Sequence, residues 1–413
     1  MTDAGAGAPV PSAGPPRRPA LWLLVIITMS GTLAMHMFIP ALPDVARDLG
    51  AGIPAVQATI SLYILGLAVG QLVYGPLSDG FGRRPVLMVG LALYAAAGLA
   101  AAVAPGIQSL VAARLMQALG GCAGLVLARA MVRDTSESED AVRRLSLLSL
   151  IVAVGPAMAP VVGATLSAGI GWRAIFLLLA GLGVASLLFS WRLLPETGRP
   201  TGQVAVGALA RGYGALLRAP VFVAYVIGGS CATMSMYAFV ATAPFIFMGE
   251  LHRPPQELGI YLGVLVAGAS LGMALAGRLV GITGIERLMT GASALSLSAA
   301  LFYLTVVLLG QQTVALSLVP FFLYAVGTGA VSPAAVAKSV SVVPGLVGTA
   351  AGLFGFTQFA VGALSTTLAG LGGRPSLATA CVLVCAGILA QAAFWTARRW
   401  ERRLLAAAPP VRG

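Results

Sequence analysis

The sequence predicts an all-α membrane protein with twelve transmembrane helices in two pseudo-symmetric six-helix bundles. Three observations support this fold class. The 413 residues are 58% hydrophobic and only 9% charged, with a mean hydropathy of +0.94, and so few charges cannot cover the surface of a soluble domain. The apolar residues occur in runs as long as a bilayer-spanning helix. Arginines concentrate in alternate loops between these runs, as the positive-inside rule requires.

The apolar runs predict where the helices begin and end. They cover residues 20–41, 55–75, 85–104, 109–131, 144–167, 172–193, 220–247, 257–280, 287–309, 314–336, 347–370 and 376–397. Residues 1–19 are rich in Gly, Ala, Pro and Ser and predict a disordered lead. The longest polar interruption, 194–219, predicts a linker between a first bundle at 20–193 and a second at 220–397, with a tail at 398–413.

The basic residues orient these helices. Twenty of the 25 fall in loops or helix ends on one side, four fall on the other, and Arg114 lies inside a span. The arginine-rich side is expected to be cytoplasmic, so the lead, the linker and the tail all lie in the cytoplasm. The net charge of +12 is scattered among short loops, which indicates membrane topology and not a nucleic-acid partner.

A polar segment at residues 75–85 separates the second and third apolar runs. It reads Gly-Pro-Leu-Ser-Asp-Gly-Phe-Gly-Arg-Arg-Pro, which places three charges in a tight loop at the cytoplasmic face. The pattern resembles the signature loop between helices 2 and 3 of the major facilitator superfamily. The resemblance implies that Asp79 meets the start of helix 11, near residues 347–349, where the helix dipole attracts a negative charge.

These charges are expected to form a cytoplasmic gate. Arg83 can pair with Asp79 and with Asp134 at the end of the fourth span. The pairs would favour the state in which the cytoplasmic side is closed. The residues assigned to this gate are Gly75, Asp79, Gly82, Arg83, Arg84 and Asp134.

A weak internal repeat supports the division into halves. Gly277, Leu279 and Gly284 reproduce the offsets of Gly75, Leu77 and Gly82 at a distance of 202 residues, without an equivalent of the aspartate. Two related halves with a site between them near the midplane are typical of a transporter. No segment reads as the selectivity filter of a channel.

Two motifs inside the spans narrow the family. Arg114-Leu-Met-Gln117-Ala is similar to the superfamily's intramembrane Arg-x-x-Gln-Gly motif, with alanine in place of glycine. The fifth span carries a motif similar to the helix 5 signature of drug:proton antiporters, although it departs from the signature after the first two residues. This antiporter motif consists of Gly155, Pro156, Pro160 and Gly163.

Together these features resemble the bicyclomycin/chloramphenicol-resistance (Bcr/CflA) branch of the drug exporters. The resemblance implies a monomeric multi-pass protein of the bacterial inner membrane that exports amphipathic drugs in exchange for protons. It implies no cofactor beyond the proton gradient, and its partners are the drug, protons and lipid. Import of a metabolite such as a sugar or amino acid, and a receptor without flux, remain as alternatives.

Proton coupling needs a titratable group inside the membrane. The candidates within the spans are His36 and Arg114. Histidine titrates near neutrality, whereas arginine stays protonated and can only influence a proton site. The family places an aspartate where this chain has His36, so either His36 carries the proton, or coupling lies elsewhere or is absent. A neutral histidine bonded to a backbone carbonyl is the structural alternative.

Polar and aromatic residues within the spans are candidates for the wall of a drug-binding cavity. They are Tyr63, Gln117, Tyr237, Tyr324 and Gln358. Gln117 is the strongest of these because it lies one turn from Arg114 and shares its helix face. No nucleotide-binding loop or catalytic constellation occurs, and the four cysteines lack metal-ligand spacing. We therefore expect neither an enzyme, nor an ATP-driven pump, nor a metal site.

Overall fold

The computed structural model describes residues 18–136, 144, 148, 158–198, 200–202, 206–343, 346–371 and 373–407. Within these ranges all regular structure is helical, and eleven helices are long and apolar enough to cross a membrane. A shorter apolar helix, Met158–Ile170, falls within and just beyond the predicted fifth span. Residues 1–17 of the predicted lead, and residues 145–147 and 149–157 of the predicted fifth span, lie outside the described residues.

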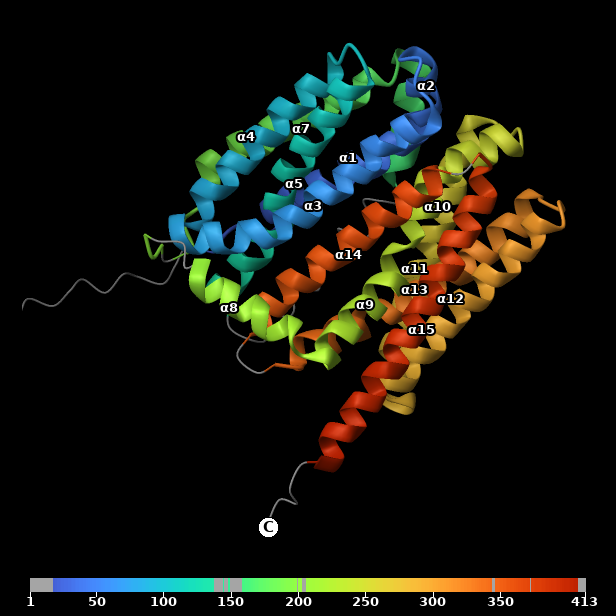
Figure 1. Cartoon of the computed structure of the whole chain (residues 1–413). Helices are drawn as coiled ribbons and strands as arrows, with labels where there is room; N and C mark the ends of the chain where they lie inside the picture. The colour runs from blue at the N-terminus through green and yellow to red at the C-terminus, as the bar shows by residue number, and fades with distance from the viewer. Residues whose placement is uncertain are drawn as a thin grey trace, which may run out of the picture.

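The helices up to α7 gather in one body, seen in blue and green in Figure 1. They are α1 (Leu21–Phe38), η1 (Ile39–Ala41), α2 (Leu42–Asp48), α3 (Ile53–Phe81), α4 (Arg83–Ala102), α5 (Ile107–Thr135), the Met158–Ile170 helix and α7 (Arg173–Leu193). We call this the first body.

The helices from α9 onward form the second body, in yellow-green to red in Figure 1. They are α9 (Pro220–Met234), α10 (Met236–Pro244), η2 (Phe245–Glu250), α11 (Pro255–Thr283), α12 (Ile285–Leu308), α13 (Val314–Ser341), α14 (Val347–Gly370) and α15 (Pro375–Ala407). The helix α8 (Val206–Leu217) lies before them and packs against α9 and α14.

Successive long helices run in opposite directions, so the molecule has two ends. We call the end that carries α2 the α2 end, and the end where Gly82 separates α3 from α4 the Gly82 end. Gly284 separates α11 from α12 at the same end of the second body. Both glycines have positive φ, 98° and 77°, where a side chain would be strained, and α3 and α11 each contain 29 residues.

The two bodies share a hydrophobic core at the α2 end. One cluster of buried residues includes Ile60 of the first body and Phe239 of the second. Along the seam α3 lies against α14, with the Gln57 side chain on Gly370 and Gln71 on Gly355. Nearer the Gly82 end a Cβ on Gly348 would meet no atom within 4 Å. The shared core therefore joins the bodies at the α2 end, and near its start α14 packs on α8, with Thr349 and Leu346 against Gly212.

The segment predicted as a loop at 75–85 is mostly helical. The helix α3 continues through Pro76 to Phe81, and the break is confined to Gly82. Proline removes one helical hydrogen bond but does not end this helix, and the Ser78 hydroxyl donates to the Gly75 carbonyl at 2.8 Å. The prediction was wrong because polar residues can continue a helix beyond the apolar span.

Three other boundaries differ from the prediction. The linker contains a helix, α8, and the span predicted at 220–247 is divided at Ser235 and ends in the π-helical segment η2. The last helix continues to Ala407, beyond the predicted residue 397. Its final turns consist mainly of Arg, Glu, Leu and Ala, which favour helix in water as well as in lipid.

Candidate functional site

A cavity of about 240 Å³ lies between the two bodies. The first body contributes residues of α1 and of the Met158–Ile170 helix, and the second contributes residues of α10 and α11. The lining residues are Thr32, His36, Pro160, Met236, Tyr237, Val240, Leu262, Leu265, Val266, Ala269, Ser270 and Met273. Mostly apolar walls with few polar groups are typical of small-molecule sites, and methionines adapt to ligands of varied shape.

His36 contributes the imidazole of this cavity lining. Its Nδ1 lies 2.9 Å from the carbonyl oxygen of Thr32. Because a carbonyl can only accept, Nδ1 carries the hydrogen, and the second ring nitrogen is left to bind or release a proton. The ring centroid of Tyr237 lies 6.2 Å away, across the junction of the bodies. The structure thus places His36 on a backbone carbonyl and also in the cavity wall.

Arg114 lies inside the first body and does not line this cavity. Its side chain is fully buried, and it donates to Gln117 Oε1 at 2.7 Å. The guanidinium carbon lies 4.0 Å from the ring centroid of Tyr63, with Phe38 and Phe176 slightly farther away. Two of its nitrogens have no hydrogen-bond partner among the described residues. Aromatic faces stabilise such a cation in place of a carboxylate.

The predicted cavity wall is split between several places. Of its five residues, Tyr237 alone joins the cavity, whereas Tyr63 donates to the Gly31 carbonyl at 2.6 Å within the first body. In the second body the Tyr324 hydroxyl bonds to Ser235 at 2.6 Å, and Gln358 donates to Thr233 at 3.0 Å. Gln117 is occupied by Arg114. These polar groups mainly satisfy hydrogen bonds inside their own bodies.

The described part of the helix 5 motif fixes α1 beside the cavity. Gly155 and Pro156 lie outside the described residues, but Pro160 lines the cavity. A Cβ on Gly163 would lie 1.8 Å from the carbonyl oxygen of Met37, the residue after His36. A glycine is therefore required for the two helices to approach this closely.

We expect Gly163→Ala to destabilise the protein by about 1–3 kcal/mol through forced separation of the two helices. Gly169→Ala in the same helix is the matched control, because a Cβ there would meet no atom within 4 Å. Thermal unfolding of the purified proteins in detergent measures the stability of both variants. Equal stability of the two variants would contradict the close approach.

The charges assigned to the gate meet within the first body. Arg83 pairs with Asp79 at 2.6 Å and with Asp134 at 2.9 Å, and its NH1 also donates to the Ser78 hydroxyl. The Arg83 side chain is 14% exposed, whereas that of Asp79 is 63% exposed. The cluster joins the ends of α3 and α5 to the start of α4. These contacts hold the three helix ends together within the first body.

Glu196 holds the start of α4 and was missed by the sequence analysis. Its carboxylate accepts hydrogen bonds from the backbone N–H groups of Arg83 at 2.9 Å and Arg84 at 3.1 Å. After it, the N–H groups of Thr201 and Gly202 donate to the carbonyls of Asp79 and Gly80, both at 3.1 Å. The first part of the linker is thus bound to the gate segment. Only the return of the chain from α7 creates these contacts, so the local sequence carries no signal for them.

A carboxylate on unpaired N–H groups stabilises a helix start. We expect Glu196→Ala to lower stability by about 1 kcal/mol and to reduce transport, since Arg83 and Arg84 would lose their fixed position. Glu196→Gln keeps one acceptor oxygen and should retain more of both properties. Thermal unfolding and transport are measured on the same preparations. Unchanged transport in Glu196→Ala would show that the capped helix start has no part in gating.

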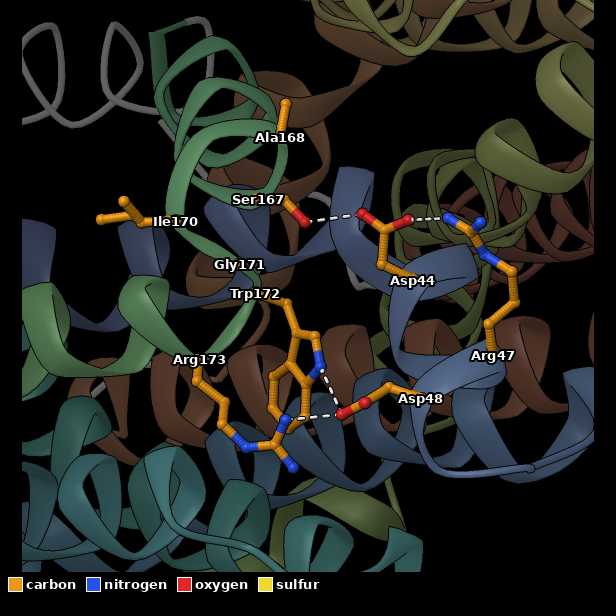
Figure 2. Close-up of a pocket in the computed structure, with 9 residues that line it drawn as sticks. All are labelled: Asp44, Arg47, Asp48, Ser167, Ala168, Ile170, Gly171, Trp172 and Arg173. Carbon is orange, nitrogen blue, oxygen red and sulfur yellow. Dashed lines mark hydrogen bonds and ion pairs between the residues drawn. The ribbon is translucent and has the colours of Figure 1, made fainter.

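A second, more open pocket lies at the α2 end and ties α2 to the turn before α7. Figure 2 shows Asp44 accepting from Ser167 at 2.7 Å and Asp48 accepting from the Trp172 indole at 3.1 Å, with Arg173 on the same carboxylate. All of these residues belong to the first body. The contacts therefore hold α2, which follows α1 and η1, against the turn before α7 without joining the bodies.

A polytopic helical protein with two bodies and a cavity at their junction has the architecture of a secondary transporter. This chain belongs to the Major Facilitator Superfamily, whose family profile matches residues 24–366. The predicted resemblance to its drug-exporting branch is confirmed by the relatives described next. Members of this superfamily are transporters rather than enzymes.

Three curated bacterial relatives cover most of the chain. An uncharacterized MFS-type transporter, YdgK of Bacillus subtilis, is 28% identical over 92% of this chain and 96% of its own. The bicyclomycin resistance protein homolog of Haemophilus influenzae is 28% identical over 84% of this chain and 87% of its own. Multidrug resistance protein D of Escherichia coli is 32% identical over 82% of this chain and 85% of its own.

Solved structures agree on the fold. A bacterial homolog of the human lysosomal transporter Spinster, in an inward-facing and occupied conformation, is similar with a TM-score of 0.71. Its identity to this chain is 15%, over 92% of this chain and 96% of that one.

Proposed function

We propose that this protein exports amphipathic drugs from the bacterial cytoplasm by alternating access, in antiport with protons. The cavity between the bodies carries the proposal, because it unites an apolar, methionine-containing wall with the titratable His36. The relatives, whose names include bicyclomycin resistance and multidrug resistance, support this substrate class. The protein would act as a monomer in the inner membrane and need no cofactor.

The distribution of arginines orients the transporter. The Gly82 end is the cytoplasmic end, twelve helices cross the membrane, and both termini lie in the cytoplasm. Contacts between the bodies at the α2 end would then close the periplasmic side, while Asp79 at the cytoplasmic end pairs with Arg83 of its own body. This conformation would receive drug from the cytoplasm.

His36 is the proposed proton carrier. Its Nδ1–H remains on the Thr32 carbonyl while the other nitrogen gains or loses the transported proton at the cavity. Arg114 stays charged in its aromatic cage and keeps the first body positive near the site. Drug would lie against Tyr237 and the methionines, in the same cavity as the His36 ring. Binding of drug and protonation of His36 would therefore oppose each other.

The gate would act when the bodies rock toward each other at the cytoplasmic end. Asp79, held by Arg83, would then meet the start of α14 and its positive dipole. Such a contact contributes about 1–2 kcal/mol to the outward-open state when partly buried.

Accumulation of drug in cells tests the direction of transport. Expression in an efflux-deficient host should lower the accumulation of chloramphenicol or a cationic dye, and an uncoupler should restore it. Increased accumulation would indicate import of a metabolite-like substrate and would contradict export. Lowered accumulation that persists with an uncoupler would contradict proton antiport.

A further inference from the structure

We propose that the Gly82 end of α15 binds the phosphate headgroup of an anionic phospholipid. The site is a pocket of about 300 Å³ lined by Trp395, Arg398, Arg399 and Arg402. Three arginines and one aromatic ring form a receptor for an anion at a membrane surface. The inference does not depend on which drug the protein transports.

The spacing of these residues places them on neighbouring turns of one helix. Arg398 and Arg399 follow Trp395 by three and four residues, and Arg402 follows one turn later. The Arg399 guanidinium carbon lies 3.3 Å from the ring centroid of Trp395, so the ring holds the charge in place. Arg398 is held from the other side by Glu286 at 3.2 Å. Two of the three guanidinium groups are therefore fixed before a ligand arrives.

The neighbouring carboxylates are already engaged. Glu401 accepts from Lys338 at 3.3 Å and from the Tyr225 hydroxyl at 2.8 Å. Glu286 is shared between Lys338 and Arg398. Within the described part of the chain, Arg399 and Arg402 have no carboxylate partner. This leaves positive charge uncompensated at the pocket, which an anionic ligand would neutralise.

The position along α15 favours a lipid as the source of the anion. The apolar run of α15 is followed by a segment that begins with Arg398 and Arg399, and Trp395 and Trp400 are 54% and 44% exposed. Exposed tryptophans beside arginines mark the depth at which lipid headgroups lie. A phosphodiester accepts from guanidinium groups while its acyl chains lie along the apolar surface of α15.

Titration of the purified protein in detergent with phosphatidylglycerol tests the site. Quenching of tryptophan fluorescence by brominated phosphatidylglycerol reports lipid bound beside exposed tryptophans such as Trp395 and Trp400, and native mass spectrometry counts the retained lipid. Each arginine near a membrane surface contributes about fivefold in affinity. We therefore expect the double variant Arg399→Gln/Arg402→Gln to bind about 25-fold more weakly, and phosphatidylcholine to bind weakly to both proteins.

Arg278→Gln/Arg287→Gln is the matched control, because both arginines are exposed at the same end but lie outside this pocket. Its affinity for phosphatidylglycerol should stay near that of the wild type. Equal weakening in the two double variants would overturn the site and indicate general surface charge only. Competition by inorganic phosphate at equal concentration would show a free-anion site and would also overturn the lipid assignment. Folding of each variant is checked by its thermal unfolding.

Discussion

The variant His36→Gln should lose uphill efflux of drug while retaining downhill exchange. Glutamine approximates the size of histidine and can still donate to the Thr32 carbonyl, but it cannot carry a proton between the two sides of the membrane. The cavity and the packing against Tyr237 should remain. In proteoliposomes with an imposed pH gradient, accumulation against the drug gradient should therefore disappear, and the pH dependence of uphill transport should disappear with it.

The second histidine of the chain provides the control for this experiment. His252 lies in the turn between η2 and α11 at the α2 end, away from the cavity lining. The same substitution, His252→Gln, should leave uphill efflux at the wild-type level. Uphill, pH-dependent efflux that persists in His36→Gln would remove His36 from the coupling mechanism.

The variant Asp79→Asn should reduce export about 5- to 30-fold with little change in membrane insertion. In the observed conformation Asp79 is 63% exposed and pairs with Arg83, and such exposed pairs contribute little to stability. The loss should arise in the outward-open state, where the charge on the dipole of α14 is worth about 1–2 kcal/mol. Loss of 1–2 kcal/mol changes the ratio of the outward-open to the inward-open state by about 5- to 30-fold.

Glu257→Gln is a suitable comparison for Asp79→Asn. Glu257, which is partly exposed, pairs with Arg253 at 2.8 Å at the α2 end of the second body. The same loss of a negative charge there should leave the transport rate nearly unchanged. Normal export by Asp79→Asn, measured at equal amounts of protein in the membrane, would end the assignment of Asp79 to the gate.

The fold was predictable because the bilayer imposes simple rules on the chain. Apolar runs and arginine placement indicated the spans, and Gly82 and Gly284 marked the equivalent breaks. The ends of the helices were less predictable, since α3 passes through Pro76 and α15 continues into its arginines. Neither extension changes the hydropathy of the spans, which was the signal used.

The site was predictable only where a residue type is rare within a membrane. His36 stood out for that reason, and the structure places it in the cavity. The apolar residues of α11 that form most of the opposite wall could not be singled out, because all faces of that helix are apolar. Tyr63 and Tyr324 were polar candidates whose hydroxyls instead bond within their own bodies. Glu196 depends on the path of the linker, which no local pattern reveals.

Distances between the two bodies test the central claim of alternating access most directly. Spin labels at Ile170 and Leu309 report the α2 end, and labels at Arg133 and Ser341 report the Gly82 end; all four positions are exposed at helix ends. The labels are introduced as cysteines after replacement of the four native ones. On addition of chloramphenicol or a change of pH across the range that supports transport, the first distance should lengthen while the second shortens. Two distances that stay constant while the same preparation transports drug would contradict rocking of the bodies about the cavity.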